Sequence, residues 1–131
     1  DTPTYWSTFG QVAIMVMFQI GGLGIMTAAT LLGLAAGRRL SLSSQAIALT
    51  EHGHLNRAEA RSLIKLVLVV SVVIEAVVAL VLWLRWHLGH QMDAGEAAWH
   101  AVFHSVSAFN NAGFSTFSDS LMGWSGDAVI L

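Results

Sequence analysis

The chain of 131 residues is 55% apolar and only 11% charged, whereas soluble domains carry roughly 25% charged residues. Its formal net charge of −2 gives no basic field for nucleic acid, and the absence of cysteine excludes a disulfide framework or a cysteine-based metal site. This composition predicts an integral membrane protein. The chain starts without methionine and ends on an apolar stretch, so we expect an excerpt of a longer membrane protein.

The first predicted element covers residues 1–37, with no charged side chain between Thr2 and Gly37. Residues 6–36 would form a helix roughly 46 Å long. This stretch is longer than the approximately 20 residues that a membrane span requires. Tyr5 and Trp6 at its start suit a membrane interface. We therefore predict a transmembrane helix here.

Three glycines interrupt this helix in the string QIGGLG. A phosphate-binding loop is excluded because no strand precedes them. Small residues let membrane helices approach closely, so we expect helix packing at Gly21, Gly22 and Gly24. The neighbouring Gln19 either forms hydrogen bonds inside the bundle or faces a pore, and the sequence leaves both open.

Residues 38–61 form a polar segment, and five of the six basic residues fall between positions 38 and 65. An excess of Lys and Arg marks a cytoplasmic loop. Within this loop we expect a short helix at residues 44–50. Asn56 would cap the next helix, with Glu59 completing a capping box.

Residues 62–86 are the second predicted span, with Trp83 and Trp86 placed for an interface belt at its outer end. Glu75 is its one acidic residue. An ionisable residue inside a span is by default a functional candidate, and Glu75 would either pair with a basic residue or form hydrogen bonds within the bundle. Residues 87–93 would be an external linker.

Residues 94–109 are predicted to be a half-helix. Asp93, three residues before Glu96, suits its N-cap. The uncharged part, residues 97–109, is roughly 20 Å long, too short to cross a bilayer and typical of a re-entrant segment. The polar string 110–118 follows, and residues 119–131 would hold an external turn and the start of a further span near Gly126.

Irregular backbone at membrane depth is tolerated only where protein buries it or where it lines a watery cavity. A pore loop meets the second condition; the alternative is an ordinary kinked span over residues 97–117. His100 and His104 share a helix face, but a zinc site would need further ligands, and the glutamate of an HExxH motif is absent. We expect both histidines to pack behind the loop. Ser105 and Ser107 beside His104 are a weak hint of intramembrane hydrolysis.

Two strings carry a family resemblance. FHSVSAFNNAGFS, residues 103–115, closely resembles the second pore loop of the Trk/Ktr/HKT potassium-transporter superfamily, and FGQVAIMVMFQIGGLGIMT, residues 9–27, resembles the inner helix that closes its first pore unit. The resemblance implies an all-α integral membrane fold of four helix–pore loop–helix units, potassium-channel-like and pseudo-fourfold. This chain would hold only part of it.

The resemblance assigns each element a place. Residues 1–37 would close unit one, residues 62–86 would be the first helix of unit two, and residues 94–109 its re-entrant pore half-helix. Residues 110–118 would be the filter loop, and residues 119–131 would lead into the closing helix of unit two. The first helix of a unit lies away from the ions, which favours a structural role for Glu75.

The implied function is potassium uptake through a carbonyl-lined selectivity filter, without enzymatic activity. The family's filter positions correspond to Asn110, Asn111, Ala112, Gly113 and Phe114, with K⁺ bound at Asn110, Asn111, Ala112 and Gly113 and Na⁺ as the alternative cation. No cofactor is expected in this chain.

The resemblance also implies partners: the lipid bilayer, a second copy in a homodimer, and a cytosolic TrkA/KtrA-like regulatory ring that would bind NAD or ATP/ADP. The expected location is the bacterial inner membrane, as a multi-pass protein, with no nucleic acid. Two alternatives stay open: a structural helical membrane subunit without a pore, and an intramembrane metalloprotein dependent on His100 and His104.

Overall fold

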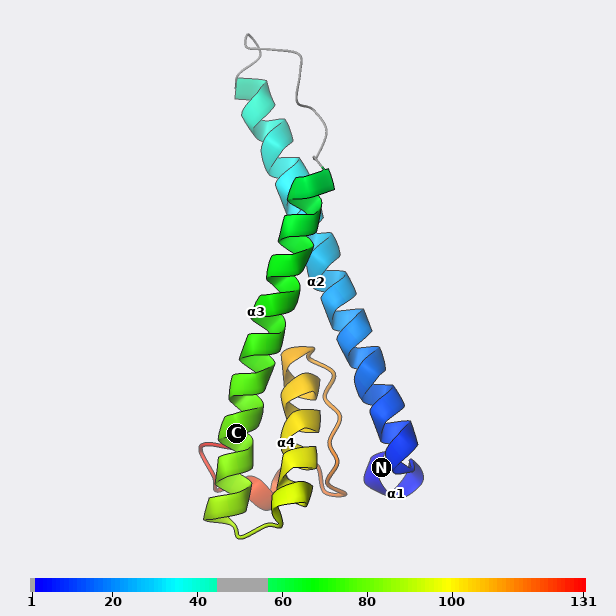
Figure 1. Ribbon diagram of the computed structural model, residues 1–131, viewed down its shortest axis with the longest axis vertical. Coiled ribbons are helices and arrows are strands. Elements are labelled where there is room, and N and C mark those ends of the chain that lie inside the picture. Colours follow the sequence, from blue (N-terminus) through cyan, green and yellow to red (C-terminus); the bar gives the residue numbers. More distant parts are fainter. Residues whose placement is uncertain (1, 45–56) are drawn as a thin grey trace.

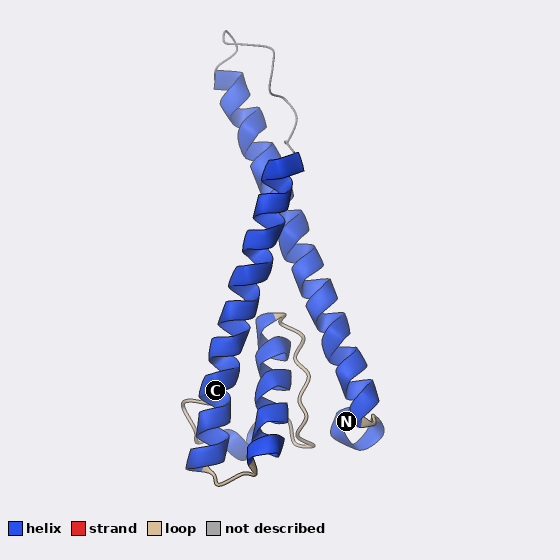
Figure 2. Ribbon diagram, viewed as in Figure 1, coloured by secondary structure: helices blue, strands red, loops and turns tan. Residues whose placement is uncertain are grey.

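A computed structural model describes residues 2–44 and 57–131, with the backbone alone for residues 38–44. These residues form helices, turns and loops without any strand (Figure 2). The elements in chain order are α1 (Thr2–Tyr5), α2 (Thr8–Ser44), α3 (Arg57–Leu84), the π-helix η1 (Arg85–Gly89), α4 (Ala94–Phe109) and the 3₁₀-helix η2 (Met122–Trp124).

The two long helices α2 and α3 cross each other, and the short helix α4 lies in the angle between them (Figure 1). Two segments, Thr8–Gly37 and Arg57–Gly89, are long and apolar enough to cross a membrane. Both predicted spans therefore contain a long helix, but the first predicted element, residues 1–37, is interrupted at Trp6 and Ser7, between α1 and α2. An α-helix satisfies all its backbone hydrogen bonds internally, which is what an apolar solvent demands.

The first long helix is longer than predicted, whereas the next one begins where its capping signal places it. Helix α2 continues past Gly37 to Ser44, and α3 begins at Arg57. Arginine and leucine are good helix formers, so Arg38 and Arg39 add charge without ending the helix. The expected helix at residues 44–50 and the Asn56 cap lie outside the described residues.

The C-terminal end of α3 differs from the prediction as well. The chain passes directly from Leu84 into η1, so only residues 90–93 remain of the expected linker 87–93. Trp86 is fully buried, with 0% of its surface exposed, and therefore does not belong to an interface belt. It packs edge-on against His104 and Phe117, with ring centroids 5.4 Å apart in each pair.

Helix α4 packs against α3 through a line of small residues. Ala97, Ala101 and Ser105 recur every fourth position, so they share one helix face, and none is more than 1% exposed. Small side chains allow this close approach. A hydrophobic cluster continues the contact near the C-terminal end of α3, where Leu82 and Trp86 meet Ala97, Ala101 and Ile130.

The segment after η2 is a turn in the structure, where the sequence predicted the start of a helix. The amides of Ile130 and Leu131 both donate to the carbonyl of Asp127, at 3.1 and 3.2 Å. The Asp127 carboxylate accepts from Arg85 Nε at 2.7 Å and from His90 Nε2 at 2.9 Å. These contacts fasten the C-terminal turn to η1.

Candidate functional site

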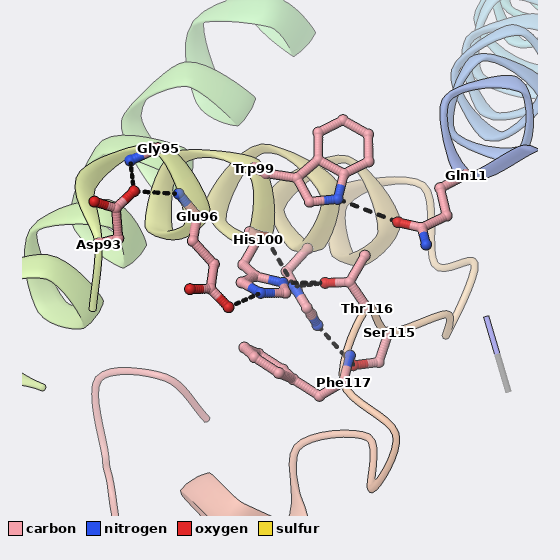
Figure 3. Close-up of polar contacts among 10 residues, drawn as sticks. Gln11, Asp93, Gly95, Glu96, Trp99, His100, Ser115, Thr116 and Phe117 are labelled. Atoms are coloured by element: carbon pink, nitrogen blue, oxygen red, sulfur yellow. Dashed lines mark hydrogen bonds and ion pairs between the residues drawn. The ribbon is translucent and has the colours of Figure 1, made fainter. Parts of the chain in front are cut away.

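Helix α4 begins where the sequence predicts. The Asp93 carboxylate accepts hydrogen bonds from the amides of Gly95 and Glu96, at 2.9 and 3.4 Å (Figure 3). These two bonds satisfy amides that the first helical turn leaves without partners. The helix spans Ala94–Phe109, the bounds expected for the half-helix.

The C-terminal end of α4 is closed by a Schellman motif. The amide of Ala112 donates to the carbonyl of Ser107 at 2.8 Å, and the amide of Asn111 donates to that of Ala108 at 3.0 Å. This motif requires a residue in the left-handed conformation directly after the C-cap. Asn111 occupies that position and has φ = 52°. Asparagine is one of the few residues other than glycine that adopt this conformation readily. The sequence NNAG therefore ends the helix.

Gly113 adopts a second left-handed conformation, with φ = 72°. A Cβ at this position would meet no atom within 4 Å. The requirement for glycine here is therefore conformational rather than steric.

After this turn the chain runs back along α4 toward the end at which the helix began (Figure 1). Three contacts fix the return: Ser107 Oγ donates to Phe114 O at 2.7 Å, His104 Nε2 lies 2.8 Å from Ser115 Oγ, and His100 Nδ1 lies 2.6 Å from Thr116 Oγ1. Residue numbers fall along the helix as they rise along the loop. Helix and loop therefore form an antiparallel hairpin.

Both histidines pack behind the loop, as predicted. The ring of Phe117 stacks on His100 and on His104, with centroids 4.3 and 5.2 Å away. His104 Nδ1 lies 2.8 Å from the His100 carbonyl, which only accepts, so this nitrogen carries a proton. In the neutral ring Nε2 then accepts from Ser115. Figure 3 shows His100 between Thr116 and Glu96, whose carboxylate lies 3.7 Å from His100 Nε2.

Neither enzymatic alternative gains support from these contacts. In the described part of the chain, no three side chains of His, Cys, Asp or Glu are grouped to hold a metal ion. The Ser105 hydroxyl donates to the Glu75 carbonyl at 2.6 Å, and Ser107 bonds to the Phe114 backbone. His104 contacts Ser115 rather than either of these serines.

The backbone carbonyls of the turn differ in their hydrogen bonding. Among the described residues, the carbonyl oxygens of residues 110–113 accept no hydrogen bond. The Phe114 carbonyl is occupied by the Ser107 hydroxyl. Four of the five predicted filter residues therefore offer a free carbonyl, and Phe114 does not.

A polar cluster joins the end of α4 to both long helices. Gln19 Nε2 donates to Glu75 Oε2 at 2.9 Å. Asn110 Nδ2 lies 3.0 Å from Gln19 Oε1 and 3.3 Å from Glu75 Oε1. Of the two options for Gln19, the structure has the hydrogen bonds inside the bundle. Glu75, which is 8% exposed, likewise bonds within the bundle, and no ion pair to a basic side chain is found among the described residues.

The three glycines of QIGGLG differ in their surroundings. A Cβ on Gly22 would lie 1.8 Å from Asn110 Oδ1, so this position accepts no larger residue while Asn110 stays in place. A Cβ on Gly21 or Gly24 would meet nothing within 4 Å. Among the described residues, Gly22 therefore packs against Asn110, whereas Gly21 and Gly24 contact no neighbouring element, and their role in helix packing stays a prediction.

Further contacts of α2 with α4 and with the returning loop were missed from the sequence. Trp99 Nε1 donates to Gln11 Oε1 at 3.2 Å (Figure 3), and Phe18 packs on Phe103 and Phe114 with centroids 5.9 and 5.0 Å away. Along α4 and its C-cap, Trp99, Phe103 and Asn110 follow one another at separations of four and seven residues, the spacing of one helix face. That spacing was the available signal.

Comparison with known proteins identifies the family of the chain. All 131 residues match the TrkH family, described as cation transport proteins. The chain is 39% identical over 130 residues to the Ktr system potassium uptake protein B of Vibrio alginolyticus, covering 99% of this chain and 28% of that protein. It is 36% identical to the protein of the same name from Bacillus subtilis (strain 168), covering 99% of this chain and 29% of the relative.

The potassium/sodium uptake protein NtpJ of Enterococcus hirae is 34% identical over 125 residues, which are 93% of this chain and 27% of that protein. The chain thus spans less than a third of the length of these relatives. All three are named as uptake proteins for alkali cations rather than as enzymes. On the match over its whole length, the chain belongs to the TrkH family of cation transport proteins.

Proposed function

We propose that this chain supplies one pore loop of a potassium uptake protein and that the carbonyls of residues 110–113 form one quarter of its selectivity filter. The observation that carries the proposal is the hairpin of α4 and its returning loop, in which those four carbonyls accept no hydrogen bond from any residue that the structure describes. A cation that leaves water needs oxygen ligands in place of its hydration shell, and rows of backbone carbonyls supply them.

The length and direction of α4 support a re-entrant position in the membrane. Its 16 residues extend about 24 Å, less than the roughly 30 Å of a bilayer core. The C-terminal end of a helix carries partial negative charge, and in α4 this end points at the turn with the free carbonyls. A cation is therefore stabilised where the proposed filter lies.

Potassium is the proposed principal cation because the relatives from Vibrio and Bacillus are named for potassium uptake. The Enterococcus relative is named for potassium and sodium, so Na⁺ is the competing ion. The remaining units of the pore, a second copy in a dimer, a cytosolic nucleotide-binding ring and a bacterial inner-membrane location are further parts of the proposal. They rest on the family resemblance.

Substitution of Gly113 tests the filter assignment. In the complete transporter, Gly113→Ser places a side chain in open space but forces it into a left-handed conformation, at a cost of about 1–2 kcal/mol. If the turn relaxes by rotating its carbonyls, we expect the ratio of K⁺ to Na⁺ uptake to fall roughly 5- to 30-fold.

Gly126→Ser is the matched control, since Gly126 also faces open space but has no positive φ. Uptake of both ions is measured in cells that lack their own potassium transporters, at equal amounts of protein in the membrane. An uptake ratio that Gly113→Ser leaves at the wild-type value contradicts the filter assignment.

A further inference from the structure

The side chains of Gln19, Glu75 and Asn110 form a closed triangle of hydrogen bonds, which we call the amide–carboxylate clamp. Each residue comes from a different helix: α2, α3 and the C-cap of α4. We propose that this clamp positions the filter loop and thereby sets the affinity and selectivity for the transported cation. The inference rests on the proposed function.

The donors and acceptors of the clamp fit in one arrangement only. Each Glu75 oxygen faces an amide nitrogen, one from Gln19 and one from Asn110. Gln19 therefore donates to Glu75 and uses its own oxygen to accept from Asn110 at 3.0 Å. Reversing the Asn110 amide would bring its oxygen against the oxygens of both partners. The position of Glu75 thus requires a side chain with two acceptor oxygens and no donor group of its own, which a carboxylate provides.

Asn110 is the residue through which the clamp reaches the loop. It is the C-cap of α4 and directly precedes Asn111, whose left-handed conformation starts the turn. Its Nδ2 also lies 2.9 Å from the Val106 carbonyl on its own helix, so the two hydrogens of this amide are shared among three acceptors. A displacement of Asn110 therefore displaces the carbonyls that follow it.

Glu75 holds α4 a second time through its backbone. The Ser105 hydroxyl donates to the Glu75 carbonyl at 2.6 Å, five residues before Asn110. One residue of α3 is thus bonded to α4 through both its carbonyl and its side chain. We assign Glu75 and Gln19 as positioning residues, since neither belongs to the free carbonyls of the turn.

Gly22 gives the clamp its space on α2. The Asn110 side chain lies where a Cβ of residue 22 would stand, and Asn110 Oδ1 is buried there without a hydrogen-bond partner among the described residues. The oxygen faces the bare Cα of Gly22, a contact that only glycine permits. A methyl group at this position would push Asn110 away while leaving Gln19 and Glu75 chemically unchanged.

Two glycines on the same helix provide the first test. The test uses the complete transporter: Gly22→Ala displaces Asn110, whereas the methyl group of Gly24→Ala meets no atom of the described residues within 4 Å. We expect Gly22→Ala to raise the KM for K⁺ uptake roughly tenfold and to lower the K⁺/Na⁺ ratio. Gly24→Ala should change neither quantity.

An exchange of the two α2 and α3 side chains provides the second test. Glu75→Gln alone sets an amide donor against another donor, and we expect a similar rise in KM. The double variant Gln19→Glu with Glu75→Gln restores all three bonds with one of them reversed, because the carboxylate at position 19 accepts from both remaining amides. Its KM should return to within about threefold of wild type.

The outcomes separate the two proposals. Gly22→Ala with a wild-type KM and uptake ratio overturns the clamp, and so does an exchange variant no better than Glu75→Gln. Equal losses in Gly22→Ala and Gly24→Ala also overturn it. If Glu75→Gln lowers the amount of protein in the membrane and the exchange variant does not restore it, that result also counts against the clamp. If Gly113→Ser leaves the uptake ratio unchanged, the filter assignment fails instead.

Discussion

Ser107 closes the hairpin by bonding twice to a single residue. Its hydroxyl donates to the Phe114 carbonyl at 2.7 Å and accepts from the Phe114 amide at 3.0 Å. The side chain is only 3% exposed, so water does not readily replace it. Ser107→Ala removes both bonds, each worth about 1 kcal/mol, and the loop should lose about 2 kcal/mol of local stability.

Hydrogen exchange of the Phe114 amide measures this loss directly, because the amide exchanges when the loop opens locally. A loss of about 2 kcal/mol corresponds to roughly 30-fold faster exchange. Ser105→Ala is the matched control, since Ser105 lies on the same helix but donates to Glu75 on α3. Equal protection of Phe114 in wild type and Ser107→Ala, or equal loss in both variants, would refute the reasoning.

Two further predictions concern topology and pH. Because the chain has no cysteine, single cysteines at the exposed positions 94 and 118 should both react from the outer side and one at position 61 from the inner side; labelling of positions 94 and 118 from opposite sides would favour the subunit without a pore. Hydrogen bonds from His90, the Val129 amide and Arg85 lower the pKa of Asp127 from its ordinary 3.8 to about 2. A lowered carboxyl pKa stabilises the folded state above about pH 4, and that stability is lost as the pH falls toward 2. Thermal unfolding should show this loss in wild type, whereas Asp127→Asn should be less stable at neutral pH and lack that part of the acid dependence.

The membrane spans and the half-helix could be predicted because their signals are local. An uncharged run of sufficient length, an Asp93 cap and the string NNAG each determine structure within a few residues. The bounds Ala94–Phe109 followed from them. The same local reasoning failed at Arg38, because a change in polarity marks the edge of the hydrocarbon and not the end of a helix.

The clamp and the burial of Trp86 could not be predicted in this way. Gln19, Glu75 and Asn110 are separated by at least 35 positions, and nothing local relates them. Their contact depends on how α2 crosses α3, which is decided by packing. Likewise the π-helix η1 follows Leu84 and places Trp86 in the aromatic cluster. A tryptophan at the end of a span is otherwise typical of the membrane interface.

The polar residues of α4 can now be sorted by the partner that each face meets. His100, His104 and Ser107 face the returning loop, and Ser105 faces α3. Asn110 faces α2 and α3 together. A polar group without a hydrogen-bond partner is destabilising in an apolar solvent. Each of these side chains would therefore destabilise a simple membrane span that offered it no partner.

The same assignment explains why the segment holds polar residues but no charge between Ala97 and Ser118. Hydroxyl, imidazole and amide groups bind neighbouring backbone and side chains without a counter-ion. They fix the loop from behind, and within the described part of the chain the carbonyls of residues 110–113 stay without a hydrogen bond. A lysine or arginine at His100, His104 or Ser107 would place a fixed positive charge behind the proposed cation site. A pore loop for cations therefore requires polarity without basic residues, which is the composition that interrupts the apolar run at SAFNNAGFS.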